Sequence, residues 1–104
     1  MLVFFTADWC SYCEELVEES FRHPAVATLS QRFVCTLIDA DVEKDVCQRF
    51  GVASYPTIQF LSPAGVPLNR MTGKKAPRQV AIEMQTALQA VARRLNSPVE
   101  SLTR

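Results

Sequence analysis

The first part of the chain alternates between a short apolar run and a helical pattern. Leu2 to Phe5 is continuously apolar, which is typical of a central strand covered on both faces. From Glu14 to Phe21, apolar residues recur at spacings of three and four and predict an amphipathic helix whose glutamates form a solvated face. The inward stripe is Cys13, Leu16, Val17 and Phe21. Asp8 or Ser11 is expected to cap this helix.

A second strand–helix unit follows the first. His23-Pro24 ends the first helix, since proline disfavours helical geometry in the residue before it, and a short helical piece follows. Phe33 to Ile38 is β-branched and apolar enough to be the next strand. A further helix is predicted to stop at Gly51, which suits a left-handed helix end. Its inward residues, four apart, are Val42, Val46 and Phe50.

A hairpin and a long helix complete the pattern. Thr57 to Leu61 and Leu68 to Thr72 predict an antiparallel pair, because the proline and glycine between them suit a tight turn. Ala76 to Asn96 predicts a helix with a long apolar stripe, including Met84 in the core. We therefore expect one domain over residues 1–96 and a tail over 97–104. The element order predicts an α/β sandwich whose sheet is parallel early and antiparallel late.

Composition narrows the class of protein. The chain has 104 residues, of which 48% are hydrophobic and 21% charged, as in an ordinary globular domain. Lys plus Arg and Asp plus Glu number 11 each, so we expect no nucleic-acid partner. No apolar run approaches the roughly 20 residues of a spanning helix. The start Met1-Leu2-Val3 lacks a secretory signal, so the compartment stays open: cytoplasm, or bacterial periplasm if an upstream signal has been removed.

Cysteines supply the candidate chemistry. Cys10 and Cys13 stand three apart at the start of a predicted helix, so one thiolate can attack a disulfide and the other can complete the exchange. A structural disulfide or half of a zinc site is the alternative, but Cys35 and Cys47 are too far apart to supply a second close pair. Haem attachment would need a histidine where Glu14 stands. Cys35 and Cys47 are expected to be small buried side chains.

Several stretches together resemble the thioredoxin superfamily. They are Trp9-Cys10-Ser11-Tyr12-Cys13, Asp41 opening a helix that closes with Phe50-Gly51-Val52, Ser54-Tyr55-Pro56-Thr57, and Gly73 before the last helix. Each is a weak signal alone, but their order and separations are specific. The resemblance runs from Leu2 to about Leu95 and implies a thioredoxin-like three-layer sandwich with a mixed sheet of about four strands and helices on both faces.

The resemblance also implies roles for individual residues. Cys10 would be the exposed nucleophile, Cys13 the buried resolving thiol and Pro56 a cis-proline packed against the pair. The backbone of Tyr55 would then pair with a bound peptide like an added strand. Trp9 and Tyr12, which flank the cysteines, would form an apolar rim for that peptide. The partners expected are a protein or peptide disulfide and an upstream thiol donor of electrons, with no bound cofactor.

The chain departs from the family pattern at three points. Phe4 and Leu37 stand where thioredoxin has a buried acid and a nearby lysine, so that proton relay is missing. Glu14 follows Cys13 where a lysine is common, and a nearby carboxylate disfavours the thiolate. The family's usual first strand and helix are absent, which leaves Phe33 to Ile38 as an unprotected sheet edge. Either the fold is a smaller, glutaredoxin-like core or an upstream segment has been removed.

These observations favour a thiol–disulfide oxidoreductase that reduces protein disulfides. A dithiol whose thiolate is less stabilised is a better electron donor, which favours a reductase. Two alternatives remain: a disulfide oxidase or isomerase using the same cysteines, and a redox-silent module that binds peptides at Tyr55-Pro56.

Overall fold

A computed structural model describes residues 1–95 of the chain; the predicted helix end at Asn96 and the predicted tail lie outside the described residues. A mixed sheet of four strands forms the centre of the fold, in the order β2-β1-β3-β4. β1 is parallel to β2 and antiparallel to β3, and β3 is antiparallel to β4. The strands are β1 (Leu2–Thr6), β2 (Cys35–Asp39), β3 (Thr57–Leu61) and β4 (Pro67–Thr72). The predicted strands and hairpin are therefore confirmed.

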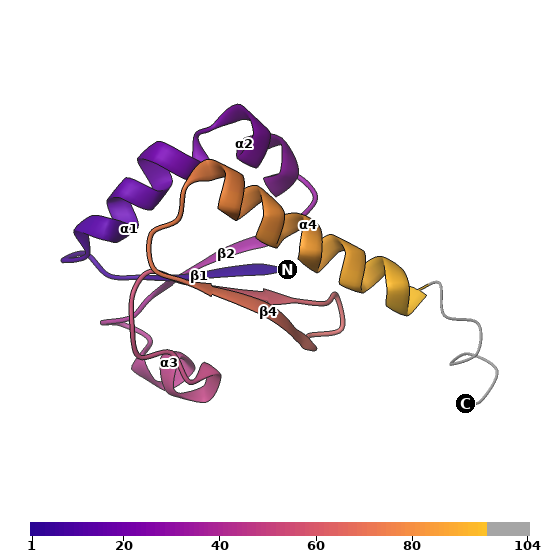
Figure 1. The fold of residues 1–104 in the computed structure, drawn as a ribbon. Coiled ribbons are helices and arrows are strands. Elements are labelled where there is room, and N and C mark those ends of the chain that lie inside the picture. The colour runs from indigo at the N-terminus through magenta and orange to yellow at the C-terminus, as the bar shows by residue number, and fades with distance from the viewer. Residues whose placement is uncertain (96–104) are drawn as a thin grey trace.

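Helices cover both faces of this sheet and make the three layers that the element order predicts. They are α1 (Ser11–Leu16), which continues into the π-helical turn η1 (Val17–Phe21), then α2 (Pro24–Ser30), α3 (Lys44–Phe50) and α4 (Pro77–Leu95). Figure 1 shows α1, α2 and α4 on one side of the sheet and α3 on the other. None of these described helices is both long enough and apolar enough to cross a membrane.

The core is built around β1, which is buried along almost its whole length. Side chains on both of its faces are covered, which explains why Leu2 to Phe5 is apolar without alternation. The largest fully buried side chains come from β1, β3 and the helices above them: Phe5, Phe60, Leu2, Leu16, Ile58 and Met84. Burying each such side chain stabilises the fold by about 1.5 to 3 kcal/mol, so the position of β1 is strongly fixed.

Helix ends follow local hydrogen bonds, and one of them differs from the prediction. Cys10, and neither Asp8 nor Ser11, is the N-cap of α1, because its sulfur accepts a hydrogen bond from the backbone N–H of Cys13. His23 caps α2 through its Nδ1, which accepts from the N–H of Ala25. Gly51 ends α3 with a φ of 65°, as predicted.

Two predictions about burial are wrong, and both concern the region of β2. Cys35 is exposed because β2 has a single neighbouring strand among the described residues. The edge position itself is as predicted, and Val34 and Leu37 are exposed there too. Val42 is 77% exposed and does not face inward. Backbone N–H groups of Val42 and Glu43 bond to the carbonyl of Asp39 in a turn, so α3 begins only at Lys44.

The buried stripe of α4 gives a direct test of this core. Met84 is 0% exposed, whereas Ile82 on the same helix is 43% exposed. Met84→Ala is expected to lower the free energy of unfolding by about 2 to 5 kcal/mol, because it removes packed volume that neighbours cannot refill. Ile82→Ala serves as the matched control and should cost no more than about 1 kcal/mol. Urea unfolding of the oxidised protein measures both; equal losses would contradict the described packing.

Candidate functional site

Cys10 and Cys13 lie at the junction between the central strand and the helix that follows it. β1 ends at Thr6, and a turn closed by the N–H of Cys10 on the carbonyl of Ala7 leads into α1. The two cysteines form a disulfide, with Cα atoms 5.3 Å apart. The N–H of Cys13 donates to Cys10 Sγ over 3.1 Å. This bond and the positive end of the helix stabilise a thiolate on Cys10 when the pair is reduced.

The burial of Cys10 differs from the expectation of an exposed nucleophile. Cys10 is 5% exposed and Cys13 is 2% exposed. Cys10 is covered because its sulfur turns toward the first turn of α1, where it bonds to Cys13 and caps the helix. The side chains beside the pair are open instead: Trp9 is 67% and Tyr12 is 60% exposed. The surface beside the disulfide is therefore formed in part by these two aromatic side chains.

Residues around Pro56 connect to the same end of the sheet. The Tyr55–Pro56 peptide bond is cis, and Pro56 is fully buried. Its carbonyl accepts a hydrogen bond of 2.8 Å from the N–H of Gly73. The rings of Tyr55 and Trp9 meet edge to face with centroids 5.9 Å apart. The fold thus brings Trp9, Tyr55 and Pro56 together from two distant stretches of sequence. The binding of substrate by these three residues and by Tyr12 stays a prediction.

Two further residues support the aromatic pair. Asp41, which the sequence suggested only as a helix start, accepts a hydrogen bond of 3.3 Å from Trp9 Nε1. Cys47 is buried as predicted. Its side chain raises the pKa of Tyr55 first by hydrogen bonding, and burial raises this pKa further, so Tyr55 stays a neutral phenol at physiological pH. The sequence does hold one clue to this contact: Asp41 follows β2. The parallel strands β1 and β2 end at the same edge of the sheet, which brings Asp41 near the residues that follow β1.

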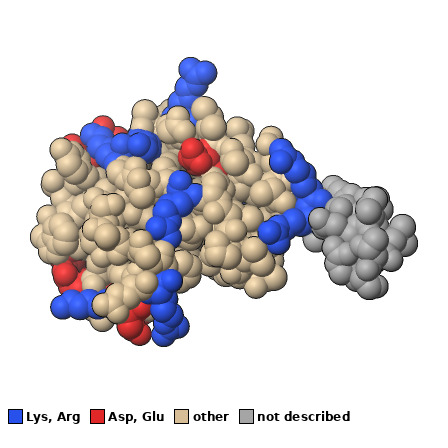
Figure 2. All heavy atoms as spheres, turned by 60° about the horizontal axis from the view of Figure 1, so that its bottom comes forward, with Lys and Arg blue, Asp and Glu red and all other residues tan. Residues whose placement is uncertain are grey.

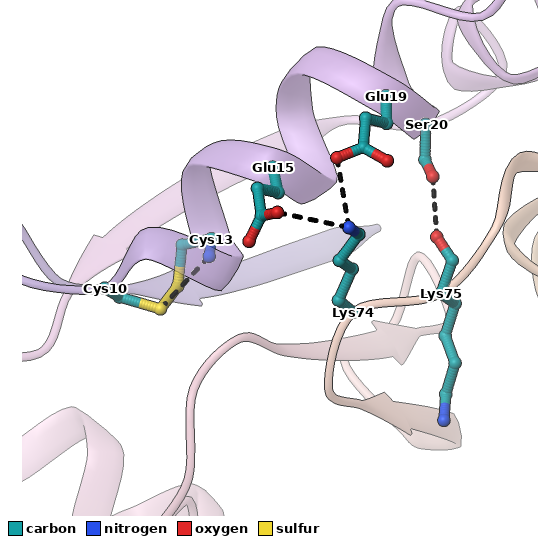
Figure 3. Close-up of polar contacts among 7 residues, drawn as sticks. All are labelled: Cys10, Cys13, Glu15, Glu19, Ser20, Lys74 and Lys75. Atoms are coloured by element: carbon teal, nitrogen blue, oxygen red, sulfur yellow. Dashed lines mark hydrogen bonds and ion pairs between the residues drawn. A yellow bond between two sulfur atoms is a disulfide. The ribbon is translucent and has the colours of Figure 1, made fainter.

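Lys74 and Lys75, in the segment before α4, bond to the cysteine-bearing helix through Glu15, Glu19 and Ser20 (Figure 3). We call this set of contacts the latch. Lys74 Nζ lies 3.3 Å from Glu15 Oε1 and 3.0 Å from Glu19 Oε2. The hydrogen bond to Glu19, followed by that to Glu15, raises the pKa of Lys74 above its usual value. Beside it, the buried hydroxyl of Ser20 donates to the carbonyl of Lys75 over 2.6 Å.

Sequence reasoning missed this latch because it joins residues more than fifty positions apart. The glutamates of α1 and η1 were expected to form a solvated face, and the side chains of Glu15 and Glu19 are 43% and 54% exposed even though Lys74 binds both. Gly73, next in the chain, bonds to Pro56. The segment 73–75 is therefore fixed both to the proline loop and to the cysteine-bearing helix.

Phe4 and Leu37, which stand where thioredoxin has the acid and the lysine of its proton relay, line an open groove beside Cys13. Phe4 and Leu37 are partners in the β1–β2 register. Both face a groove of about 400 Å³ that is also lined by Cys13. Phe4 is buried and Leu37 is 66% exposed. Because both side chains are apolar, neither an acid nor a lysine is present at these two positions. Residues 1–95 contain no cluster of three or more His, Cys, Asp or Glu side chains placed to hold a metal ion.

Known proteins resemble the chain in sequence and in structure. A model of the family described as thioredoxin-like domain matches residues 1–88. A probable protein disulfide-isomerase A6 of Medicago sativa is 30% identical over 80 residues, covering 77% of this chain and 22% of its own. A protein disulfide-isomerase of Gallus gallus is 34% identical over 80 residues, covering 76% and 14%. The chain thus spans about a fifth or less of the length of these relatives.

Solved structures show the same fold. A thioredoxin from Thermus thermophilus superposes with a TM-score of 0.80 at 23% identity, covering 88% of this chain and 75% of its own. The C-terminal domain of Neisseria meningitidis DsbD in its oxidised form gives 0.69 at 20% identity, covering 83% and 78%. The disulfide between Cys10 and Cys13, at the start of the helix after the central strand, supports thiol–disulfide oxidoreductase chemistry. By its family match and its fold, the chain belongs to the thioredoxin-like domain family.

Proposed function

We propose that the protein is a thiol–disulfide oxidoreductase that reduces protein disulfides and is recharged by an upstream thiol donor. The observation that carries this proposal is the Cys10–Cys13 disulfide at the start of α1, with the N–H of Cys13 directed at Cys10 Sγ. That N–H favours the thiolate form of Cys10, and the thiolate is the species that attacks a disulfide.

The reaction transfers two electrons in two exchange steps. In the reduced protein, the Cys10 thiolate attacks one sulfur of the substrate disulfide; a Cys10–substrate disulfide forms, and the other substrate sulfur leaves and takes up a proton. Cys13 then loses its proton and attacks Cys10 Sγ, which releases the second substrate sulfur as a thiol and closes the Cys10–Cys13 disulfide. The donor's two thiols reduce that disulfide and restore the starting state.

The surroundings of the pair support electron donation as its direction. Phe4 and Leu37 place no charged group behind Cys13, and the carboxylates of Asp8, Glu14 and Glu18 line the groove beside it. Negative charge near a cysteine disfavours the thiolate, so these acidic residues partly oppose the effect of the Cys13 N–H. A thiolate that is less stabilised makes the reduced form less favoured and the dithiol a stronger reductant.

A disulfide isomerase is the second candidate, and the sequence relatives favour it, since those named above are disulfide isomerases at 30% and 34% identity. An isomerase makes the same first attack but lets another thiol of the substrate displace Cys10. The two functions therefore differ in their need for Cys13: reduction requires it in every turnover, whereas isomerisation does not.

The latch around Lys74 positions the two sides of the site. Pro56 and Gly73 lie on one side, and the cysteine-bearing helix lies on the other, joined through Lys74, Glu15 and Glu19. Lys74 is a positioning residue in this proposal, because its contacts are with the helix and no observation places it against the sulfurs.

Cysteine variants test the proposed function. In an insulin-reduction assay with dithiothreitol, Cys10→Ser is expected to fall to the rate of dithiothreitol alone, because no thiolate begins the exchange. Cys13→Ser should accumulate a disulfide between Cys10 and insulin, seen by mass spectrometry without reductant. Cys47→Ser, which alters a buried thiol outside the disulfide, is the control for loss of a cysteine. Parent-like reduction by Cys10→Ser would rule out the mechanism.

Loss of the Lys74 cation tests the latch. Lys74→Gln is expected to lower kcat/KM for insulin reduction by about tenfold, within the roughly hundredfold that misplacement by 1 Å can cost. The loss should fall mainly on KM, and Lys74→Arg should recover most of it because arginine can bridge both glutamates. Arg49→Gln breaks an exposed ion pair with Asp45 on α3 and is the matched control. A Lys74→Gln protein with parent kinetics would show that the latch has no part in the site.

A further inference from the structure

The groove beside Cys13 has both apolar and acidic residues in its lining. The apolar ones include Phe4, Val17 and Leu37, and the acidic ones are Asp8, Glu14 and Glu18. The volume of about 400 Å³ opens at the surface next to the redox pair, since Cys13 is part of its wall. No step of the exchange reaction described above uses this groove.

The negative charge of the groove is only partly neutralised by the protein itself. Residues 1–21 contain five carboxylates and no Lys or Arg. Glu18 pairs with Arg22 at 3.0 Å, and Lys74, the cation on the other side of α1, is held by Glu15 and Glu19. In the described part of the chain, Asp8 and Glu14 form no ion pair. Two carboxylates beside the disulfide therefore remain open to a cation from outside.

Acidic residues are concentrated in the first half of the sequence. Of its eleven acidic residues, nine lie within residues 1–48. Figure 2 shows Lys and Arg, without acidic side chains, at the end of the molecule next to the grey residues, which is the end away from the start of α1 in Figure 1. The basic side chains at that end repel positively charged segments, whereas the carboxylates of Asp8 and Glu14 beside the disulfide attract them.

One kind of side chain matches both properties of the groove. Lysine and arginine have an apolar stem that packs on hydrophobic surface and a cationic head that seeks a carboxylate. The reach is also suitable: two residues of extended chain, at roughly 3.4 Å each, exceed the 5.3 Å between the Cα atoms of Cys10 and Cys13. For a basic residue only one position away, its long side chain covers the remaining distance of about 2 Å. A substrate bonded to Cys10 can thus place a neighbouring side chain in the groove.

Resting on the proposed function, we propose that the protein selects polypeptide disulfides with Lys or Arg one or two residues from the attacked cysteine. The basic side chain lies along Phe4, Val17 and Leu37, and its charge meets Asp8 and Glu14. The exposed faces of Trp9 and Tyr12 add cation–π contacts for a second basic residue. The groove is therefore a specificity site for basic substrates.

Matched peptides test this inference without any upstream donor. Three disulfide peptides, identical except for Lys, Met or Glu two residues from the cysteine, are mixed with pre-reduced protein, and thiol release is followed over a single turnover. The Lys peptide should react at least about threefold faster than the Glu peptide at low salt, as expected for surface ion pairs. The ratio should approach one in 1 M NaCl, where the Debye length is only about 3 Å.

Variants locate the preference in the groove. Asp8→Asn combined with Glu14→Gln should remove most of the Lys-over-Glu ratio, whereas Asp45→Asn combined with Glu43→Gln, an equal charge change at the start of α3, should leave it unchanged. A general effect of the carboxylates on Cys10 alters both rates alike and cancels in the ratio.

Equal rates for all three peptides, or a ratio that survives in the double variant, would contradict the role of the groove in substrate selection and leave the reductase proposal standing. If no peptide is reduced, both proposals fail. A ratio that disappears as protein concentration rises would assign the groove to a second copy of the chain and overturn the substrate inference.

Discussion

The central position of β1 is the constraint on which the rest of the structure depends. β1 is hydrogen-bonded on both edges, to β2 and to β3, and its side chains are buried on both faces. Its last residue, Thr6, therefore has one fixed place at the edge of the sheet. The chain can continue only by turning at Ala7 into the helix above, and that turn delivers Cys10 as the helix cap and Cys13 one turn later. The redox pair is placed by burial of an apolar strand that carries no chemistry itself.

Contacts from three other parts of the chain complete the site around that pair. Asp41 follows β2 and holds the indole of Trp9, and Tyr55 packs on the same ring from the loop before β3. Gly73 follows β4 and bonds to Pro56. Because all of these residues lie beyond strand ends at one edge of the sheet, small shifts between strands would separate them. The Lys74 latch opposes such shifts by joining the last of these segments to α1 and η1.

Local patterns in the sequence were sufficient for most of the fold and for the reactive pair. The unbroken apolar run at Leu2 to Phe5, the proline after His23 and the left-handed Gly51 each determine structure through near neighbours, and each prediction from them is confirmed.

Features that depend on residues far apart in the sequence could not be predicted from local patterns. Cys35 is as apolar as a core residue, and its exposure on the edge strand β2 depends on which parts of the chain pack over that strand. Glu15 and Glu19 stay solvated as their spacing predicts, but both bind a lysine more than fifty residues later, which no local pattern indicates. The cap on α1 was missed because a disulfide-bonded sulfur, and not an oxygen, accepts the bond.

The direction of electron flow is the central claim of the functional account. The proposal that the pair donates electrons rests on the apolar residues Phe4 and Leu37 and on the acidic residues that line the same groove beside Cys13. The most direct measurement is the reduction potential of the Cys10–Cys13 disulfide, obtained by equilibrating the protein with glutathione and counting free thiols. The account predicts a value near the roughly −270 mV of a reducing thioredoxin. A value near the roughly −120 mV of a strong disulfide oxidant would contradict it.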